Sequence, residues 1–228
     1  MQVLGQRRTV LAGSNFGKAA LMGLSLAVSA TFMALAIEAP QHFWLGWISL
    51  LPLLQAARAL SPLGAFGAGS FWGASLFAAS AAMGSNNIEF GVSSLAILTL
   101  GSALYACFGA LLTRRVGFSP YLMALGWVGV EFCLRPVGLE HGLLAGTQGD
   151  GMLIRVAGSF AGYFIIAFLV AYINASLLSV LHKVTGSCTS LRRVSSASGP
   201  IGRLLSLVTP FIPSRVLCVS QPRAPPAR

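Results

Sequence analysis

Residues 127–155 read W-V-G-V-E-F-C-L-R-P-V-G-L-E-H-G-L-L-A-G-T-Q-G-D-G-M-L-I-R and lie between two apolar parts of the chain. Only five residues of the whole sequence are acidic, and three of them, Glu131, Glu140 and Asp150, fall in this stretch. The flanking segments, 118–134 and 156–181, are each long and apolar enough to cross a hydrocarbon core of roughly 30 Å. The predicted fold class therefore depends on whether the rest of the chain also consists of such segments.

The composition is that of a membrane protein. Hydrophobic residues make up 55% of the chain and charged residues 9%, whereas a soluble domain carries roughly 25% charged residues. The mean hydropathy is +0.78. The net charge of +10 does not indicate a nucleic-acid partner, because the basic residues follow the distribution expected of membrane topology, as described below.

Six apolar segments predict an all-α fold, a polytopic bundle of six transmembrane helices. They are residues 19–37, 43–57, 63–83, 91–112, 118–134 and 156–181. The second segment is short and contains Pro52, which is expected to kink it. The third contains Gly69-x-x-x-Gly73, a spacing of small residues that lets a neighbouring helix approach closely. A cleaved signal peptide is a weaker interpretation of the first segment, because five later spans need a retained anchor.

The basic residues predict that both termini face the cytoplasm. Of the 15 basic residues, Arg135 and Arg155 alone fall on the outer side of such a topology, which leaves thirteen inside. All acidic residues fall on the outer side or close to it. This asymmetry fits the positive-inside rule. The chain then divides into a basic cytoplasmic N-terminus (1–18), a six-helix membrane domain (19–181) and a basic tail rich in Ser, Pro and Arg (182–228).

The tail 182–228 allows three interpretations. It is a disordered cytoplasmic segment held against anionic lipid, or its apolar patch 204–219 is a degenerate seventh span interrupted by Pro210 and Pro213. The third interpretation is an out-of-frame or truncated end, because the composition changes abruptly toward Arg, Ser and Pro.

Glu131 is the first candidate for a functional side chain, because a carboxylate within a span is costly and is usually paired or functional. Arg135 follows four residues later, which puts both side chains on one helix face. Two interpretations stay open. The residues form an ion pair at the outer end of the fifth span, or Glu131 contacts a substrate or lipid headgroup directly.

No motif in the sequence defines a catalytic, metal or cofactor site. Glu140 and His141 form an isolated pair in a glycine-rich loop, which is weak evidence for acid–base chemistry. The three histidines fall in separate loops without ligand spacing, so we expect no metal and no cofactor. The cysteines indicate no disulfide framework, since Cys107 and Cys133 fall in spans and the other two in the tail.

Several stretches nevertheless form an ordered series. These are P-Q-H-F-W-L-G-W-I-S-L-L-P-L-L (40–54), G-A-F-G-A-G-S-F-W-G-A-S-L-F (64–77), Trp127-x-x-x-Glu131 followed by an arginine, T-Q-G-D-G (147–151), and R-V-A-G-S-F-A-G-Y-F-I-I-A-F-L-V-A-Y-I-N-A (155–175). Taken together, the series resembles the membrane region of the apolipoprotein N-acyltransferase family over residues 19–181. The resemblance suggests these residues as lipid, substrate or structural contacts: Trp127, Glu131, Arg135, Gln148, Asp150, Arg155, Tyr163 and Asn174.

The resemblance is imperfect at several positions. Arg135 lies one residue later than the family pattern, and Gly158 stands where an acid is common. Ala161 replaces a usual glycine.

The resemblance carries implications for activity, location and partners. Family members transfer a phospholipid acyl group to the N-terminal Cys of lipoproteins through a nitrilase-like domain with a Glu-Lys-Cys triad. Here Lys18 and Lys183 are the only lysines and neither aligns with that triad, so no catalytic residue is carried over. The resemblance implies a truncated or non-catalytic protein of the bacterial cytoplasmic (inner) membrane. Its partners would be phospholipid and either a lipoprotein or a separate nitrilase-like domain.

Two other functions remain open. A scaffold or assembly protein would use the Gly-x-x-x-Gly faces for its contacts. A small transporter would need polar residues along a path through the membrane, and few are present.

Overall fold

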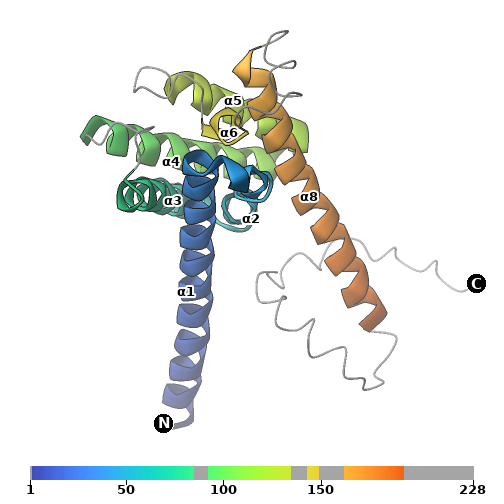
Figure 1. Cartoon of the computed structure of the whole chain (residues 1–228). Coiled ribbons are helices and arrows are strands. Elements are labelled where there is room, and N and C mark those ends of the chain that lie inside the picture. The colour runs from blue at the N-terminus through green and yellow to red at the C-terminus, as the bar shows by residue number, and fades with distance from the viewer. Residues whose placement is uncertain (1, 85–91, 135–142, 149–161, 193–228) are drawn as a thin grey trace, which may run out of the picture.

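The computed structural model describes residues 2–84, 92–134, 143–148 and 162–192 of the chain, and every element in these ranges is helical (Figure 1). The helices are α1 (Gln2–Glu38), η1 (Pro40–Trp47), α2 (Leu51–Ala59), α3 (Pro62–Ala82), α4 (Val92–Arg115), α5 (Pro120–Leu134), α6 (Leu143–Gly146) and α8 (Tyr163–Arg192). The predicted all-α class is therefore confirmed for the part of the chain that is described.

Three helices in the described ranges are long and apolar enough to cross a membrane. These segments are Gly17–Glu38, Val92–Arg115 and Tyr163–Val184, and Pro120–Cys133 is a shorter apolar helix. Helix α3 has 21 residues and is not among the three. The structure thus supports a polytopic membrane protein and includes fewer clear spans than the six predicted.

The predicted second span is not a continuous helix. It consists of the 3₁₀-helix η1, a turn, and the nine-residue helix α2, and neither helix alone could cross the hydrocarbon core. We predicted a kink at Pro52, but this residue stands in the first turn of α2, where its missing N–H costs no hydrogen bond. The chain instead breaks between Trp47 and Leu51. We call residues 47–51 the helix break.

Helices α3 and α4 pack in close contact, as the Gly69-x-x-x-Gly73 spacing predicted. A Cβ added to Gly69 would overlap the backbone of Ser102, and one added to Gly73 would lie 2.5 Å from the carbonyl oxygen of Leu98. The two helices are antiparallel, since the later glycine meets the earlier residue of α4. Glycine is required at both positions because no side chain fits between the backbones.

Two predicted boundaries fall inside helices. Helix α1 begins at Gln2, so the region 1–18 continues directly into the first span. Helix α8 continues to Arg192, beyond the boundary predicted at residue 181. In Figure 1 both helices extend well past α3, α4 and α5.

Contacts between distant segments distinguish two ends of the structure. At the first, which we call the basic end, the Arg58 guanidinium lies 5.2 Å from the centroid of the Phe118 ring and also interacts electrostatically with His182. At the other, which we call the loop end, Gln148 contacts Phe43. The second, fifth and sixth predicted segments thus bring their charged inner ends together, with the loop 143–148 at the opposite side.

Candidate functional site

The loop end is built around Glu131, which is 1% exposed. Its Oε1 atom accepts a hydrogen bond from the indole N–H of Trp127 at 2.9 Å and one from the backbone N–H of Leu144 at 2.6 Å. The spacing of four residues places Trp127 and Glu131 on the same face of α5. The carboxyl group therefore ties α5 to the first turn of α6.

Trp127 is held in turn by two aromatic side chains from neighbouring helices. Its ring meets Trp72 of α3 edge-on at 6.1 Å between centroids and Tyr105 of α4 at 4.9 Å. Such T-shaped pairs are favoured by the ring quadrupoles. The Tyr105 hydroxyl donates to the backbone carbonyl of Met123 at 3.3 Å. This aromatic cluster fixes the indole, and through it the position of Glu131.

Gln148 closes the loop end against η1. Its Nε2 group donates to the backbone carbonyl of Phe43 at 3.3 Å and to Thr147 Oγ1 at 2.8 Å. Gly46 of η1 leaves the space for these residues, because an added Cβ there would lie 2.6 Å from Thr147 Oγ1. The Oε1 atom of Gln148 is buried and has no hydrogen-bond partner within the described ranges. Gln148 is thus a buried amide with an unused acceptor.

Asn174 of α8 completes the backbone hydrogen bonding at the helix break. Its Nδ2 group donates to the carbonyls of Gly46 at 3.1 Å and Val170 at 2.9 Å, while its Oδ1 accepts from the N–H of Leu50 at 3.2 Å. The side chain is fully buried. Backbone that leaves a helix at membrane depth needs such partners, because hydrocarbon offers none.

Ser29, Trp72 and Ser49 support the same break and were not singled out by the sequence. The Ser29 hydroxyl donates to the backbone carbonyl of Ser49 and accepts from the Trp72 indole N–H, the latter at 2.9 Å. The Ser49 hydroxyl donates to the carbonyl of Gly46 at 3.1 Å. The sequence could indicate the role of Ser29 only if the position of the helix break were already known.

The structure brings together some of the predicted site residues and leaves others outside its described ranges. Glu131 accepts a hydrogen bond from Leu144 in the loop 143–148, and Gln148 is the last residue of that loop. Asn174 lies at the helix break, and Tyr163 is exposed at the start of α8. Arg135, Asp150, Arg155, Glu140 and His141 fall outside the described residues. The predicted ion pair between Glu131 and Arg135 therefore stays a prediction.

The described residues include no group of three or more metal-ligating side chains. Cys107 and Cys133 are free thiols on α4 and α5. The hydrogen-bonding groups of the loop end are buried and mostly bond to other parts of the protein, and Gln148 Oε1 is buried without a partner in the described ranges.

Fold and site together define a helical membrane domain with a loop-covered polar end. Residues 29–176 match the family model described as the apolipoprotein N-acyltransferase N-terminal domain. The match covers well over half of the 228 residues, and the chain belongs to this family. It also confirms the predicted resemblance for residues 29–176 of the range 19–181. No curated protein and no solved structure matches the chain.

Proposed function

We propose that this chain is a membrane domain that holds phospholipid and lipoprotein at the outer face of the bacterial cytoplasmic membrane for a nitrilase-like acyltransferase domain. The 228 residues alone transfer no acyl group in this proposal, since Lys18 and Lys183 are their only lysines and both belong to predicted inner segments. The membership in the N-terminal domain family supports the link to lipoprotein acylation.

One observation carries the proposal: three stretches that resemble the family, far apart in sequence, meet at the loop end. Trp127-x-x-x-Glu131 binds the first turn of α6, and Gln148 of the T-Q-G-D-G stretch binds Phe43 of the F-W-L-G-W stretch. Gln148 Oε1 is buried and has no hydrogen-bond partner among the described residues. A donor group such as the α-amine of a lipoprotein's N-terminal Cys would complete it.

The arrangement of the two ends supports the predicted sidedness of the second, fifth and sixth spans. Arg58 follows the second span, Phe118 begins the fifth and His182 follows the sixth, and these residues lie together at the basic end. Gln148 of the predicted outer loop and Phe43 at the start of the second span lie together at the loop end. Because basic residues remain in the cytoplasm, the loop end faces outward.

The contacts favour this proposal over the two alternatives. A transporter needs polar groups that face a path, yet Glu131, Asn174 and Ser29 all bond to other parts of the protein. A scaffold protein would offer the Gly69–Gly73 face to a partner, but α4 already occupies that face.

Binding and turnover of a diacylated lipopeptide with an N-terminal Cys would test the proposal. With the chain in nanodiscs of phosphatidylethanolamine and phosphatidylglycerol, fluorescence anisotropy should show saturable binding and mass spectrometry no triacylated product. Gln148→Ala should weaken binding by about fivefold, the value of one hydrogen bond of roughly 1 kcal/mol. Adding a purified nitrilase-like domain of the same family should yield triacylated peptide.

Gln41→Ala is the matched control, because Gln41 is an exposed amide in the same helix η1 that Gln148 contacts. This variant should bind like the wild type. Absence of lipopeptide binding, or equal affinity for Gln148→Ala and wild type, would overturn the role in holding substrate. Triacylated product from the chain alone would overturn the assignment as a non-catalytic domain.

A further inference from the structure

The guanidinium group of Arg58, at the basic end, is held in a defined place without an acceptor for its N–H groups. The residue is half-buried, and its Cζ atom lies 5.2 Å from the centroid of the Phe118 ring, within the range of a cation–π contact. No carboxylate and no hydrogen-bond acceptor of the described ranges pairs with this group. Because the ring supplies no oxygen, the five N–H donors of the guanidinium remain open to an external acceptor.

The nearest titratable partner of Arg58 is another basic side chain. His182 of α8 lies close enough for the two groups to interact electrostatically, and Lys183 follows it as an exposed residue. The carboxylates of the described ranges are Glu38, which ends α1 immediately before η1, and Glu131 of the loop end. Basic groups held close together repel each other when both are charged. An anion bound between them would remove that repulsion.

The basic end also coincides with the ends of two candidate spans. The spans of α4 and α8 both finish in basic residues, which are Arg114, Arg115, His182 and Lys183. A Cβ added to Gly109 of α4 would lie 3.1 Å from the Cβ of Ala57, so the end of α2 meets α4 less than two helical turns before Arg115. Arg58 therefore lies near the depth at which the headgroups of a bilayer begin.

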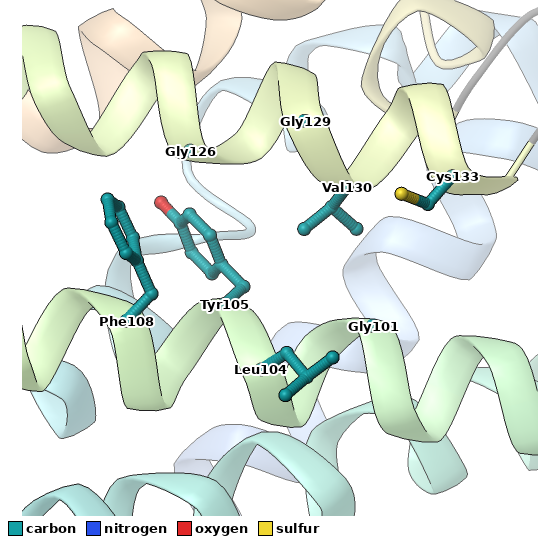
Figure 2. A pocket seen from close by; sticks show the side chains of 8 residues that line it. All are labelled: Gly101, Leu104, Tyr105, Phe108, Gly126, Gly129, Val130 and Cys133. Atoms are coloured by element: carbon teal, nitrogen blue, oxygen red, sulfur yellow. The ribbon is translucent and has the colours of Figure 1, made fainter.

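The pocket between α4 and α5 is no alternative place for an anion. None of the residues that line it is charged, and Figure 2 shows the rings of Tyr105 and Phe108 pointing from α4 toward α5. The Tyr105 hydroxyl already donates to the carbonyl of Met123 at 3.3 Å. An anion placed there would lose its water without gaining an ion pair or a hydrogen bond.

We propose that the basic end binds a phosphate anion through the N–H groups of Arg58, beside the imidazole of His182. A planar guanidinium can donate two parallel hydrogen bonds to two phosphate oxygens, a geometry that an ammonium group does not offer. The bound anion would connect α2 with α8 and so hold two predicted inner segments together. It is no acyl donor, since it lies at the end opposite Gln148.

Two sources could supply this phosphate. One is the headgroup of an anionic phospholipid, which the sidedness proposed above would place in the cytoplasmic leaflet. The other is phosphate in solution. Only the assignment to a leaflet rests on the proposed function, because a phosphate bound to Arg58 needs no particular orientation of the chain.

Native mass spectrometry of the full chain in detergent micelles, titrated with phosphatidylglycerol, tests the proposal. Retention of this lipid should be saturable and stronger than that of zwitterionic phosphatidylcholine. Arg58→Gln should weaken phosphatidylglycerol binding by about tenfold, because charge-assisted hydrogen bonds to phosphate are among the stronger ones. Arg58→Lys keeps the charge without the paired donors and should weaken binding by about threefold. Arg114→Gln is the matched control, since it removes one exposed positive charge at the same end, and should bind like the wild type.

Inorganic phosphate then identifies the source of the anion. If excess phosphate displaces phosphatidylglycerol where chloride of equal ionic strength does not, the site takes phosphate from solution. If the lipid stays bound, the headgroup is the ligand. Both outcomes support the proposal, provided that the binding depends on Arg58.

Three outcomes overturn it: equal retention of phosphatidylglycerol and phosphatidylcholine, unchanged binding in Arg58→Gln, or equal losses in Arg58→Gln and Arg114→Gln, which would indicate diffuse attraction. If Arg58→Gln fails to fold, judged by its melting temperature, Arg58→Lys decides instead. Gln148→Ala should leave this binding unchanged, and the lipopeptide is absent from the experiment. Loss of the phosphate site and loss of lipopeptide binding at Gln148 are therefore separate results.

Discussion

Glu131 acts in this structure mainly as a hydrogen-bond acceptor between two helices. Glu131→Ala would leave the Trp127 indole N–H and the Leu144 backbone N–H buried without a partner, at about 1–3 kcal/mol each. We expect the free energy of unfolding to fall by about 2–6 kcal/mol. Glu131→Gln keeps an oxygen at the same place and should cost about 1 kcal/mol or less. Reversible unfolding of the purified chain in mixed micelles, followed by circular dichroism, measures both values.

The same pair of variants tests one of the two roles that the sequence left open for Glu131, the ion pair with Arg135. If Glu131→Gln lowers the free energy of unfolding as much as Glu131→Ala, the negative charge of Glu131 contributes more to stability than its hydrogen-bond acceptor. The ion pair with Arg135 is then its main interaction. The i, i+4 spacing, applied above only to Arg135, also places Trp127 on the same helix face as Glu131. It could not identify Leu144, because that contact depends on how the loop after α5 returns to the helix.

At the level of elements, the close packing of α3 against α4 was predictable and the helix break was not. Small residues four apart indicate a helix contact wherever they occur in a span, and α4 is the partner found here. The position of the break depends instead on Asn174, which is 124 residues from Leu50 in sequence. Such long-range hydrogen bonds leave no local pattern, so the sequence indicated only a kink at Pro52.

The α3–α4 contact predicts opposite effects for two glycines in one helix. Gly69→Ala places a methyl group into the backbone of α4, and overpacking of this kind costs about 1–3 kcal/mol. Gly67→Ala meets no atom within 4 Å and should stabilise the helix by up to about 1 kcal/mol through its higher helix propensity. Thermal unfolding in detergent measures both. Equal melting temperatures for the two variants would contradict the close approach of α3 and α4.

For the whole molecule, the distribution of basic residues along the sequence predicted which segment ends lie on the same side of the membrane. The packing of the helices against one another had to come from the structure. Arg58, Arg114, Arg115 and Lys183 all fall in predicted inner segments. The contacts of Arg58 with Phe118 and His182 place three of those segments side by side. Which helices pack against one another, such as α1 against α3, depends on side-chain contacts that hydropathy does not encode.

The proposed orientation can be measured on intact bacteria. In a background with all four cysteines replaced by serine, Gln41→Cys reports on the loop end and Lys183→Cys on the basic end, since both side chains are exposed. A membrane-impermeant maleimide should label position 41 in intact spheroplasts and position 183 only after lysis, because basic residues are retained in the cytoplasm. The reverse pattern would put the loop end inside. Gln148 would then be out of reach of a lipoprotein on the outer face.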